Sequence, residues 1–165
     1  MTDTLHHYAS QLRWTGNRGN GTADYSHYGR DYTLQIPGKA ALPGSADPLF
    51  LGDPALHNPE DLFVGALAAC HMLTYLALCA HAGIQVLAYE DQAQGWLEMR
   101  PGHGGRFREA ALAPRVTIAA DSDAHRAQAL HAQAHAQCFI ANSCAMPVRC
   151  EATIVRPGEP PEAAR

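Results

Sequence analysis

One segment, residues 58–83, limits the folds open to this chain more than any other. It reads NPEDLFVGALAACHMLTYLALCAHAG and has no Asp, Glu, Lys or Arg between residues 62 and 80. Asn58 provides an N-cap, Pro59 suits the first helical position and Gly83 is a helix terminator. We therefore predict one helix of about 24 residues, roughly 36 Å long. A helix that is apolar around its whole circumference is either buried in protein or inserted in a bilayer.

The composition favours a buried helix over a membrane span. Small and polar residues dilute the apolar run, and neither flank carries the Lys or Arg anchors typical of membrane helices. The chain is 47% hydrophobic and 17% charged, as in globular proteins. One sheet covers only part of such a helix, so we expect a homodimer in which a second subunit covers the rest.

The remainder of the chain shows strand patterns and one further helix. The second helix is predicted over residues 122–138, and a long loop over residues 38–57, where loops of that length usually shape a site. Strands are predicted over residues 8–14, 31–38, 84–99, 107–119 and 146–157, with turns at residues 15–22 and 100–105. This order predicts an α+β fold in a single domain, residues 1–165, with a frayed tail after about residue 157.

Charge and cysteine content narrow the class of protein. A net charge of −4 gives no broad basic surface, which argues against nucleic-acid binding. The first seven residues lack a cationic stretch followed by an apolar core, so we expect no signal peptide. Five cysteines, without a framework of close pairs, favour a reduced, cytoplasmic protein over a secreted one stabilised by disulfides.

Cys70 is the residue of the long helix with the greatest capacity for chemistry. It lies about three turns from the helix start, where the helix dipole no longer stabilises a thiolate strongly. Apolar burial alone makes a thiol inert. A reactive Cys70 therefore requires a cation from elsewhere in the chain, and without one it is a small core residue.

Two motifs resemble the OsmC/Ohr family of thiol peroxidases. Residues 58–71, NPEDLFVGALAACH, are similar to the family signature, in which the Glu of Asn-Pro-Glu precedes the peroxidatic cysteine by ten residues. Glu60 and Cys70 keep this spacing. Residues 134–143, AHAQCFIANS, resemble the family's second helix with its resolving cysteine. Residues 14–32 and 44–53 resemble an OsmC-like branch, so the likeness covers essentially the whole chain.

The resemblance implies an OsmC-like fold, with antiparallel sheets packed around two central helices in an intertwined homodimer. It also implies that Cys70 attacks an organic hydroperoxide and becomes a sulfenic acid. Cys138 then closes a disulfide with Cys70, and an external dithiol, such as a lipoyl-bearing protein, reopens it. Such chemistry, a part of oxidative and osmotic stress defence, needs neither a metal nor a flavin. Cys144, six residues beyond Cys138, is an alternative resolving thiol.

The resemblance further implies an arginine, held by Glu60, that stabilises the Cys70 thiolate. Arg30 is the first candidate because it opens a strand shortly before the long loop, and Arg18, in the Gly-rich turn, is the second. An apolar pocket favouring alkyl or fatty peroxides is predicted from residues that the sequence places near these elements: Phe50, Phe63, Tyr28, Tyr32 and His71.

Two other functions stay open. The first is a non-catalytic thiol sensor or a binding protein for small hydrophobic ligands on the same scaffold, since a fold does not fix a function. The second is a metal site formed by His131, His135 and Cys138, which share one helical face at i, i+4 and i+7, with His71 as a further ligand. Solvated helix histidines explain that spacing more simply in a chain with ten histidines.

Overall fold

The computed structural model describes residues 4–100, 102 and 104–158. The chain divides into two compact units, Met1–Phe63 and Val64–Arg165, which are described separately below. The predicted turn at residues 100–105 includes Pro101 and His103, which lie outside the described residues, as does most of the predicted tail after residue 157.

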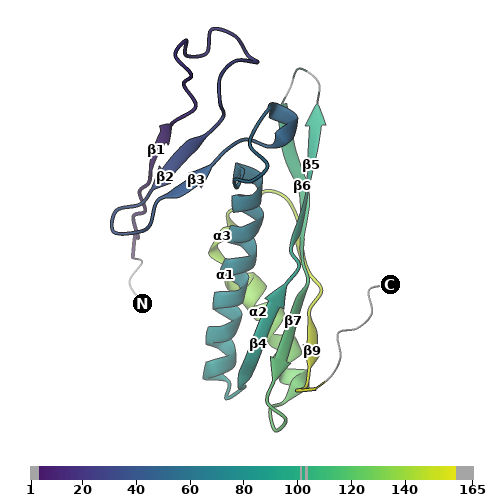
Figure 1. Ribbon diagram of the computed structural model, residues 1–165. Helices are drawn as coiled ribbons and strands as arrows, with labels where there is room; N and C mark the ends of the chain where they lie inside the picture. Colours follow the sequence, from purple (N-terminus) through teal and green to yellow (C-terminus); the bar gives the residue numbers. More distant parts are fainter. Residues whose placement is uncertain (1–3, 101, 103, 159–165) are drawn as a thin grey trace. The chain divides into compact units, whose positions relative to one another are not determined.

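The first unit contains a three-stranded antiparallel sheet in the order β1-β2-β3 (Figure 1). Its strands are β1 (Gln11–Trp14), β2 (Tyr32–Gln35) and β3 (Leu42–Gly44). The two predicted strands are confirmed at shorter length, whereas β3 and a 3-10 turn, η1 (Pro48–Phe50), occupy part of the predicted loop. β3 was not predicted because it contains Pro43, and proline is tolerated within a sheet only at an edge, which is where β3 lies. Gly44 is required there, since an added Cβ would lie 2.3 Å from the Tyr32 ring.

The long apolar helix is confirmed as α1 (Pro59–His81). Asn58 Oδ1 accepts a hydrogen bond from the Asp61 amide at 2.8 Å, and Asp61 Oδ2 accepts one from the Asn58 amide at 3.3 Å. This reciprocal cap satisfies two amides at the helix start. Gly83 follows the helix with φ +73°, a left-handed conformation that glycine adopts at low energetic cost. Local signals therefore define both ends of α1.

The second unit is built on a long bent β-hairpin. Its strands are β4 (Val86–Asp91), β5 (Gln94–Arg100), β6 (Gly104–Leu112) and β7 (Pro114–Ile118), with β4 paired to β7 and β5 to β6. The two strands predicted over residues 84–99 and 107–119 are thus each divided in two. The breaks, at residues 92–93 and at Ala113, lie opposite each other in the hairpin. There the Asp91 carboxylate accepts a hydrogen bond from the Ala113 amide at 2.8 Å, which replaces a bond of the ladder.

The last predicted strand is divided in the same way, into β8 (Val148–Cys150) and β9 (Thr153–Val155). β8 pairs with β6 and β9 pairs with β7, both in the parallel direction. The expectation of antiparallel sheets is therefore correct for the hairpin and wrong for this strand. It is reached through a helical connection, and such crossovers permit parallel pairing.

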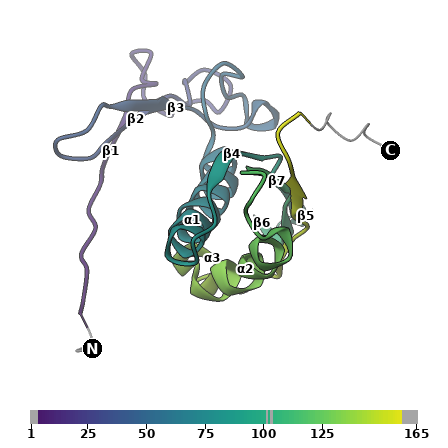
Figure 2. The same ribbon diagram turned by 90° about the horizontal axis from the view of Figure 1, so that it is seen from below.

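The second predicted helix is α2 (Ala124–Gln137), followed by the short helix α3 (Phe139–Asn142). Asp123 caps α2, because its side chain accepts a hydrogen bond from the Arg126 amide at 3.0 Å. Only one stripe of α2 is buried, formed by Ala127, His131 and Ala134. Figure 2 shows the second unit approximately end-on, with α1 and α2 enclosing the interior together with the strands.

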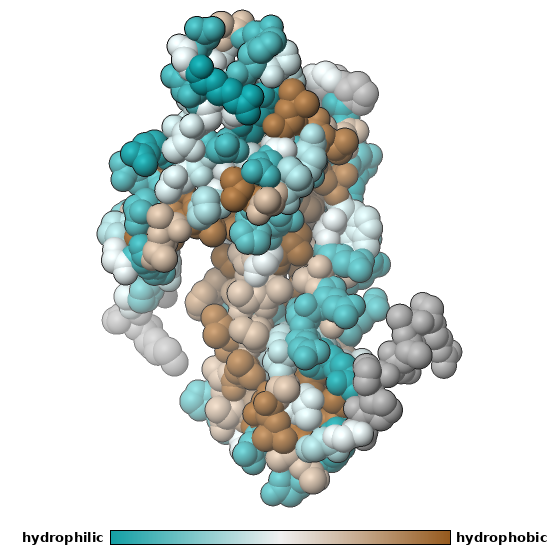
Figure 3. Space-filling model, viewed as in Figure 1, coloured by the Kyte–Doolittle hydropathy of each residue, from teal (hydrophilic) through white to brown (hydrophobic). Residues whose placement is uncertain are grey.

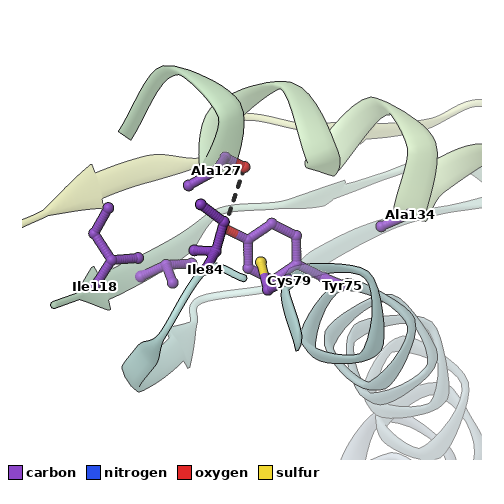
Figure 4. Packing of buried hydrophobic residues seen from close by; sticks show 7 residues of the cluster. Tyr75, Cys79, Ile84, Ile118, Ala127 and Ala134 are labelled. Atoms are coloured by element: carbon purple, nitrogen blue, oxygen red, sulfur yellow. Dashed lines mark hydrogen bonds between the residues drawn. The ribbon is translucent and has the colours of Figure 1, made fainter. Parts of the chain in front are cut away.

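The core of the second unit joins α1, α2 and the β4–β7–β9 sheet. Tyr75 is fully buried, and its hydroxyl donates to the Ala127 carbonyl at 3.2 Å, as Figure 4 shows. Alanines on the facing stripe of α2 leave room for this large ring. The cluster consists of Tyr75, Cys79, Ile84, Val116, Ile118, Ala127 and Ala134.

Most of the α1 surface is not covered within one chain. By length and composition α1 is apolar enough to cross a bilayer, a test that core helices also pass, and 22% of its most apolar stretch is buried. The buried residues form a single stripe: Leu67, His71, Tyr75 and Cys79. Figure 3 shows apolar side chains over the visible face of α1. The predicted burial of the whole helix therefore requires a further surface.

Candidate thiol site

The structure brings Cys70 and Cys138 together inside the second unit. Cys70 lies on α1 and is half-buried, whereas Cys138 follows α2 and is only 1% exposed. Burial raises the pKa of the Cys138 thiol, and a side-chain hydrogen bond from this thiol to Cys70 raises it further. Cys70 and Cys138, 68 positions apart in the sequence, are thus neighbours in the folded unit.

Cys138 has a defined local geometry because it joins two helices. Its backbone is extended, with φ −72° and ψ 111°, so that it ends α2 and also caps α3. Its amide donates to the His135 carbonyl at 3.2 Å, and its sulfur accepts a hydrogen bond from the Ala141 amide at 3.5 Å. These bonds fix the position of the sulfur, and although the Ala141 bond lowers the pKa of the Cys138 thiol, burial and Cys70 outweigh it and raise the pKa overall.

The other three cysteines are also free, and they have different surroundings. Cys79 belongs to the core cluster. Cys144, the alternative resolving thiol, donates from its sulfur to the Ile140 carbonyl at 3.2 Å. Cys150 ends β8 and faces two buried histidines.

Arg30, the first candidate for the cation, is held within the first unit by two tyrosines. Its guanidinium donates to the Tyr28 carbonyl and, at 2.6 Å, to the Tyr25 carbonyl. The same group lies 3.9 Å from the centre of the Tyr28 ring and 4.5 Å from that of Tyr25. Cation–π contacts and hydrogen bonds together therefore fix this guanidinium before any ligand binds.

Arg30 and Glu60 line the same pocket of about 340 Å³ in the first unit. Tyr32 and Phe50, two of the predicted pocket residues, line it as well. Glu60 contributes, after burial, to the raised pKa of Tyr32, which keeps that phenol neutral. The hydrogen bonds of Arg30 given above go to the tyrosine carbonyls rather than to Glu60.

The remaining predicted residues have other locations. Arg18 is exposed in a turn whose amides at Gly19 and Gly21 donate to Asn17 Oδ1. Tyr28 packs on Arg30 and Trp14, and Phe63 is half-buried on α1 at the end of the first unit.

His71 does not line the pocket of Arg30 and Glu60. It is completely buried in the second unit, where its Nε2 lies 3.0 Å from His131 Nδ1. His131 was predicted with His135 and Cys138 as a metal-ligand group. Among the described residues, the group with suitable ligand spacing is instead His71, His131 and Cys150. Cys150 was missed because it comes from a strand with no metal-binding motif.

Comparison with known proteins places this fold in a family. Residues 52–153 match the sequence model described as OsmC-like protein, so the chain belongs to the OsmC-like family. An OsmC-like protein of unknown function from Vibrio cholerae has 28% identity and a TM-score of 0.81, covering 90% of this chain and 100% of that one. The resemblance deduced from the two motifs is therefore confirmed.

Two further relatives are more distant. The uncharacterized protein YmaD of Bacillus subtilis is 22% identical over 142 residues, which is 84% of this chain and 86% of YmaD. A structure from Legionella pneumophila, described as an organic hydroperoxide resistance protein OsmC, has 19% identity and a TM-score of 0.64, and covers 92% of this chain and 98% of that one. At this identity the Legionella structure supports the fold alone.

Proposed function

We propose that this protein is a cysteine-based peroxidase that reduces organic hydroperoxides. The observation that carries the proposal is the proximity of a half-buried thiol, Cys70, to a buried thiol, Cys138. A peroxide must reach the attacking sulfur, which favours Cys70 as the nucleophile. The resolving thiol needs only to reach Cys70, so its burial is no obstacle. The same fold occurs in proteins described as organic hydroperoxide resistance proteins, which motivates the chemistry proposed here.

The proposed cycle has three steps. The Cys70 thiolate attacks the outer oxygen of the hydroperoxide, the O–O bond breaks, and the alkoxide leaves and takes up a proton as an alcohol. The Cys138 thiol then attacks the Cys70 sulfenic acid, so that an S–S bond forms and water leaves. An external dithiol finally reduces the disulfide by exchange and is itself oxidised to a disulfide. A cytoplasmic location, where such dithiols are kept reduced, remains a prediction.

The test of this function is hydroperoxide consumption by the purified protein with a dithiol such as dihydrolipoamide. We expect many turnovers per chain, faster with cumene hydroperoxide than with hydrogen peroxide, because the α1 sequence around Cys70 is apolar. Consumption no faster than that of the dithiol alone would contradict the proposal and favour a sensor or a carrier of hydrophobic ligands.

Arg30 is proposed to stabilise the Cys70 thiolate, with Glu60 orienting the guanidinium. The tyrosine contacts hold Arg30 in one conformation. Arg18 is exposed and has no comparable contacts among those described. Arg30→Ala is expected to lower kcat/KM by about 100-fold, in the range typical of a lost electrostatic contact to the transition state. Arg18→Ala is the matched control and should retain near-normal activity. Equal losses in both variants would contradict the assignment of Arg30.

A homodimer is also proposed, with a second copy of the chain covering the exposed side of α1. Apolar side chains exposed on the second unit include Leu73 on α1, at 63%, and Phe139 on α3, at 80%. Soluble monomers rarely leave such surfaces open. Light scattering should give the mass of two chains, and Leu73→Glu should shift it toward one chain. A wild-type protein that is monomeric at micromolar concentration would contradict this proposal.

A further inference from the structure

A second group of reactive side chains lies in the core of the second unit and shares no residue with the Cys70–Cys138 pair. His71 on α1, His131 on α2 and Cys150 at the end of β8 each direct one donor atom toward the other two. His71 Nε2 and His131 Nδ1 are 3.0 Å apart. The Cys150 sulfur is 3.5 Å from the first nitrogen and 4.0 Å from the second. Both histidines are at least 95% buried, with exposures of 0% and 5%.

We propose that His71, His131 and Cys150 form a binding site for a zinc-like divalent metal ion. Tetrahedral zinc, with bonds of about 2.0 Å to nitrogen and about 2.3 Å to sulfur, holds two nitrogens about 3.3 Å apart and nitrogen and sulfur about 3.5 Å apart. The three separations in this structure lie within about 0.5 Å of those values. Two imidazoles and one thiolate are also a donor set that suits zinc.

Burial acts on all three side chains of this group. It lowers the pKa of both His71 and His131 to about 4. Burial, with Asp91 and Glu151 as further causes, raises the pKa of Cys150 to about 11. An ion bound here would have to displace the Cys150 thiol proton, as zinc does at other cysteine sites.

Without an ion this cluster leaves polar atoms unsatisfied. His71 Nδ1 and His131 Nε2 are buried and have no hydrogen-bond partner among the described residues. If one ring donates to the other, one buried N–H and one buried lone pair remain unpaired, whichever tautomer is chosen. Each unpaired group destabilises the fold by about 1–3 kcal/mol. An ion bound by the two inner nitrogens would fix both rings in one tautomer, with the outer atoms, His71 Nδ1 and His131 Nε2, as N–H donors.

Two neighbours are suited to support the bound ion. Asp91 Oδ2 is buried and unpartnered within the described part of the chain, and Asp91 acts electrostatically on Cys150, so its charge would help to balance the cation. His135 acts electrostatically on His71, and its own Nδ1 is likewise unpartnered there. His135 therefore lies near His71 without a hydrogen bond between the two Nδ1 atoms.

The ion would connect three elements that meet only in the folded chain. α1 also carries Cys70, and Cys138 directly follows α2. The ion would therefore stabilise the two helices that position these thiols. The site uses neither of these thiols. Its failure would leave the proposed peroxidase function intact, and failure of that function would leave the site intact.

Cobalt substitution gives the sharpest test, because a thiolate bound to Co²⁺ produces a charge-transfer band in the near ultraviolet. We expect one equivalent of Co²⁺ to produce this band, and Zn²⁺ to displace the cobalt and raise Tm. Cys150→Ser and His131→Gln should abolish the band and weaken Zn²⁺ affinity by at least about 100-fold, since even indirect supporting residues contribute 10–100-fold. His125→Gln, an exposed histidine on the same helix, and Cys144→Ser are the matched controls and should leave the band unchanged.

The Cys70–Cys138 pair is the competing ligand, and a Cys70→Ser/Cys138→Ser double variant separates the two sites. A band that persists in this double variant supports the His71–His131–Cys150 site. A band lost in the double variant and retained in Cys150→Ser places the ion on the thiol pair and overturns the proposal, as does the absence of any band in the wild-type protein. Cys150→Ser replaces a single atom, so it decides the matter even if His131→Gln fails to fold.

Discussion

Replacing Cys70 by serine is expected to lower the rate of cumene hydroperoxide reduction by at least about 1,000-fold, as the loss of an attacking nucleophile does in other enzymes. A serine hydroxyl is not ionised at neutral pH and cannot accept the peroxide oxygen as sulfur does. Folding should be unaffected, because Cys70 is only half-buried and the change is one atom. Steady-state consumption of the hydroperoxide, with a dithiol in excess, measures the effect.

Cys138→Ser is expected to behave differently from Cys70→Ser. The first oxidation of Cys70 proceeds, one equivalent of peroxide is consumed, and turnover through the disulfide then stops. Cys144→Ser is the matched control, since its thiol donates to the Ile140 carbonyl and should not be needed. Full activity in both Cys70→Ser and Cys138→Ser would contradict the assigned chemistry, and a Cys144→Ser variant that stalls instead would transfer the resolving role to Cys144.

Tyr75→Ala should produce the largest loss of stability among single substitutions in the second unit. Tyr75 is fully buried, its ring stacks on that of His131 with centres 3.8 Å apart, and its hydroxyl bonds to the Ala127 carbonyl. Truncation removes these contacts and leaves a cavity between α1 and α2. We expect the free energy of unfolding to fall by about 3–5 kcal/mol, the usual range for a large buried aromatic side chain.

Tyr75→Phe separates packing from hydrogen bonding. It keeps the ring and removes only the hydroxyl, so the expected loss is about 1 kcal/mol. Urea unfolding followed by circular dichroism, at one fixed protein concentration, gives both values. If Tyr75→Ala lost less than about 1 kcal/mol, the packing of α2 on α1 would not be the main source of stability in this unit.

Local signals in the sequence predicted α1 well. The Asn58 cap, Pro59 and Gly83 are all recognisable without tertiary information, and both helix ends agree with the structure within two residues. The two strands of the bent hairpin were predicted as continuous segments because the break depends on a long-range bond from the Ala113 amide to Asp91. The parallel direction of β8 and β9 likewise depends on how the chain returns after α2, which no local pattern encodes.

For the candidate sites too, the sequence predicted residues that lie in local motifs and missed those that only the fold brings together. Cys70 and Glu60 were predicted because they keep the spacing of a family signature, and Cys138 because it lies in a second motif that resembles the same family. The sequence alone did not predict that Cys150 would meet His71 and His131, because the three residues come from α1, α2 and β8. The helical spacing of His131, His135 and Cys138 suggested the wrong neighbours, since the extended backbone at Cys138 ends α2 and its thiol is a neighbour of Cys70.

The most direct test of the central claim is peptide mass spectrometry of the reduced protein after one equivalent of cumene hydroperoxide. We predict a single disulfide-linked peptide pair containing Cys70 and Cys138, with Cys79, Cys144 and Cys150 still available for alkylation after denaturation. A disulfide between other cysteines, or a Cys70 that remains a free thiol while the peroxide is consumed, would contradict the account.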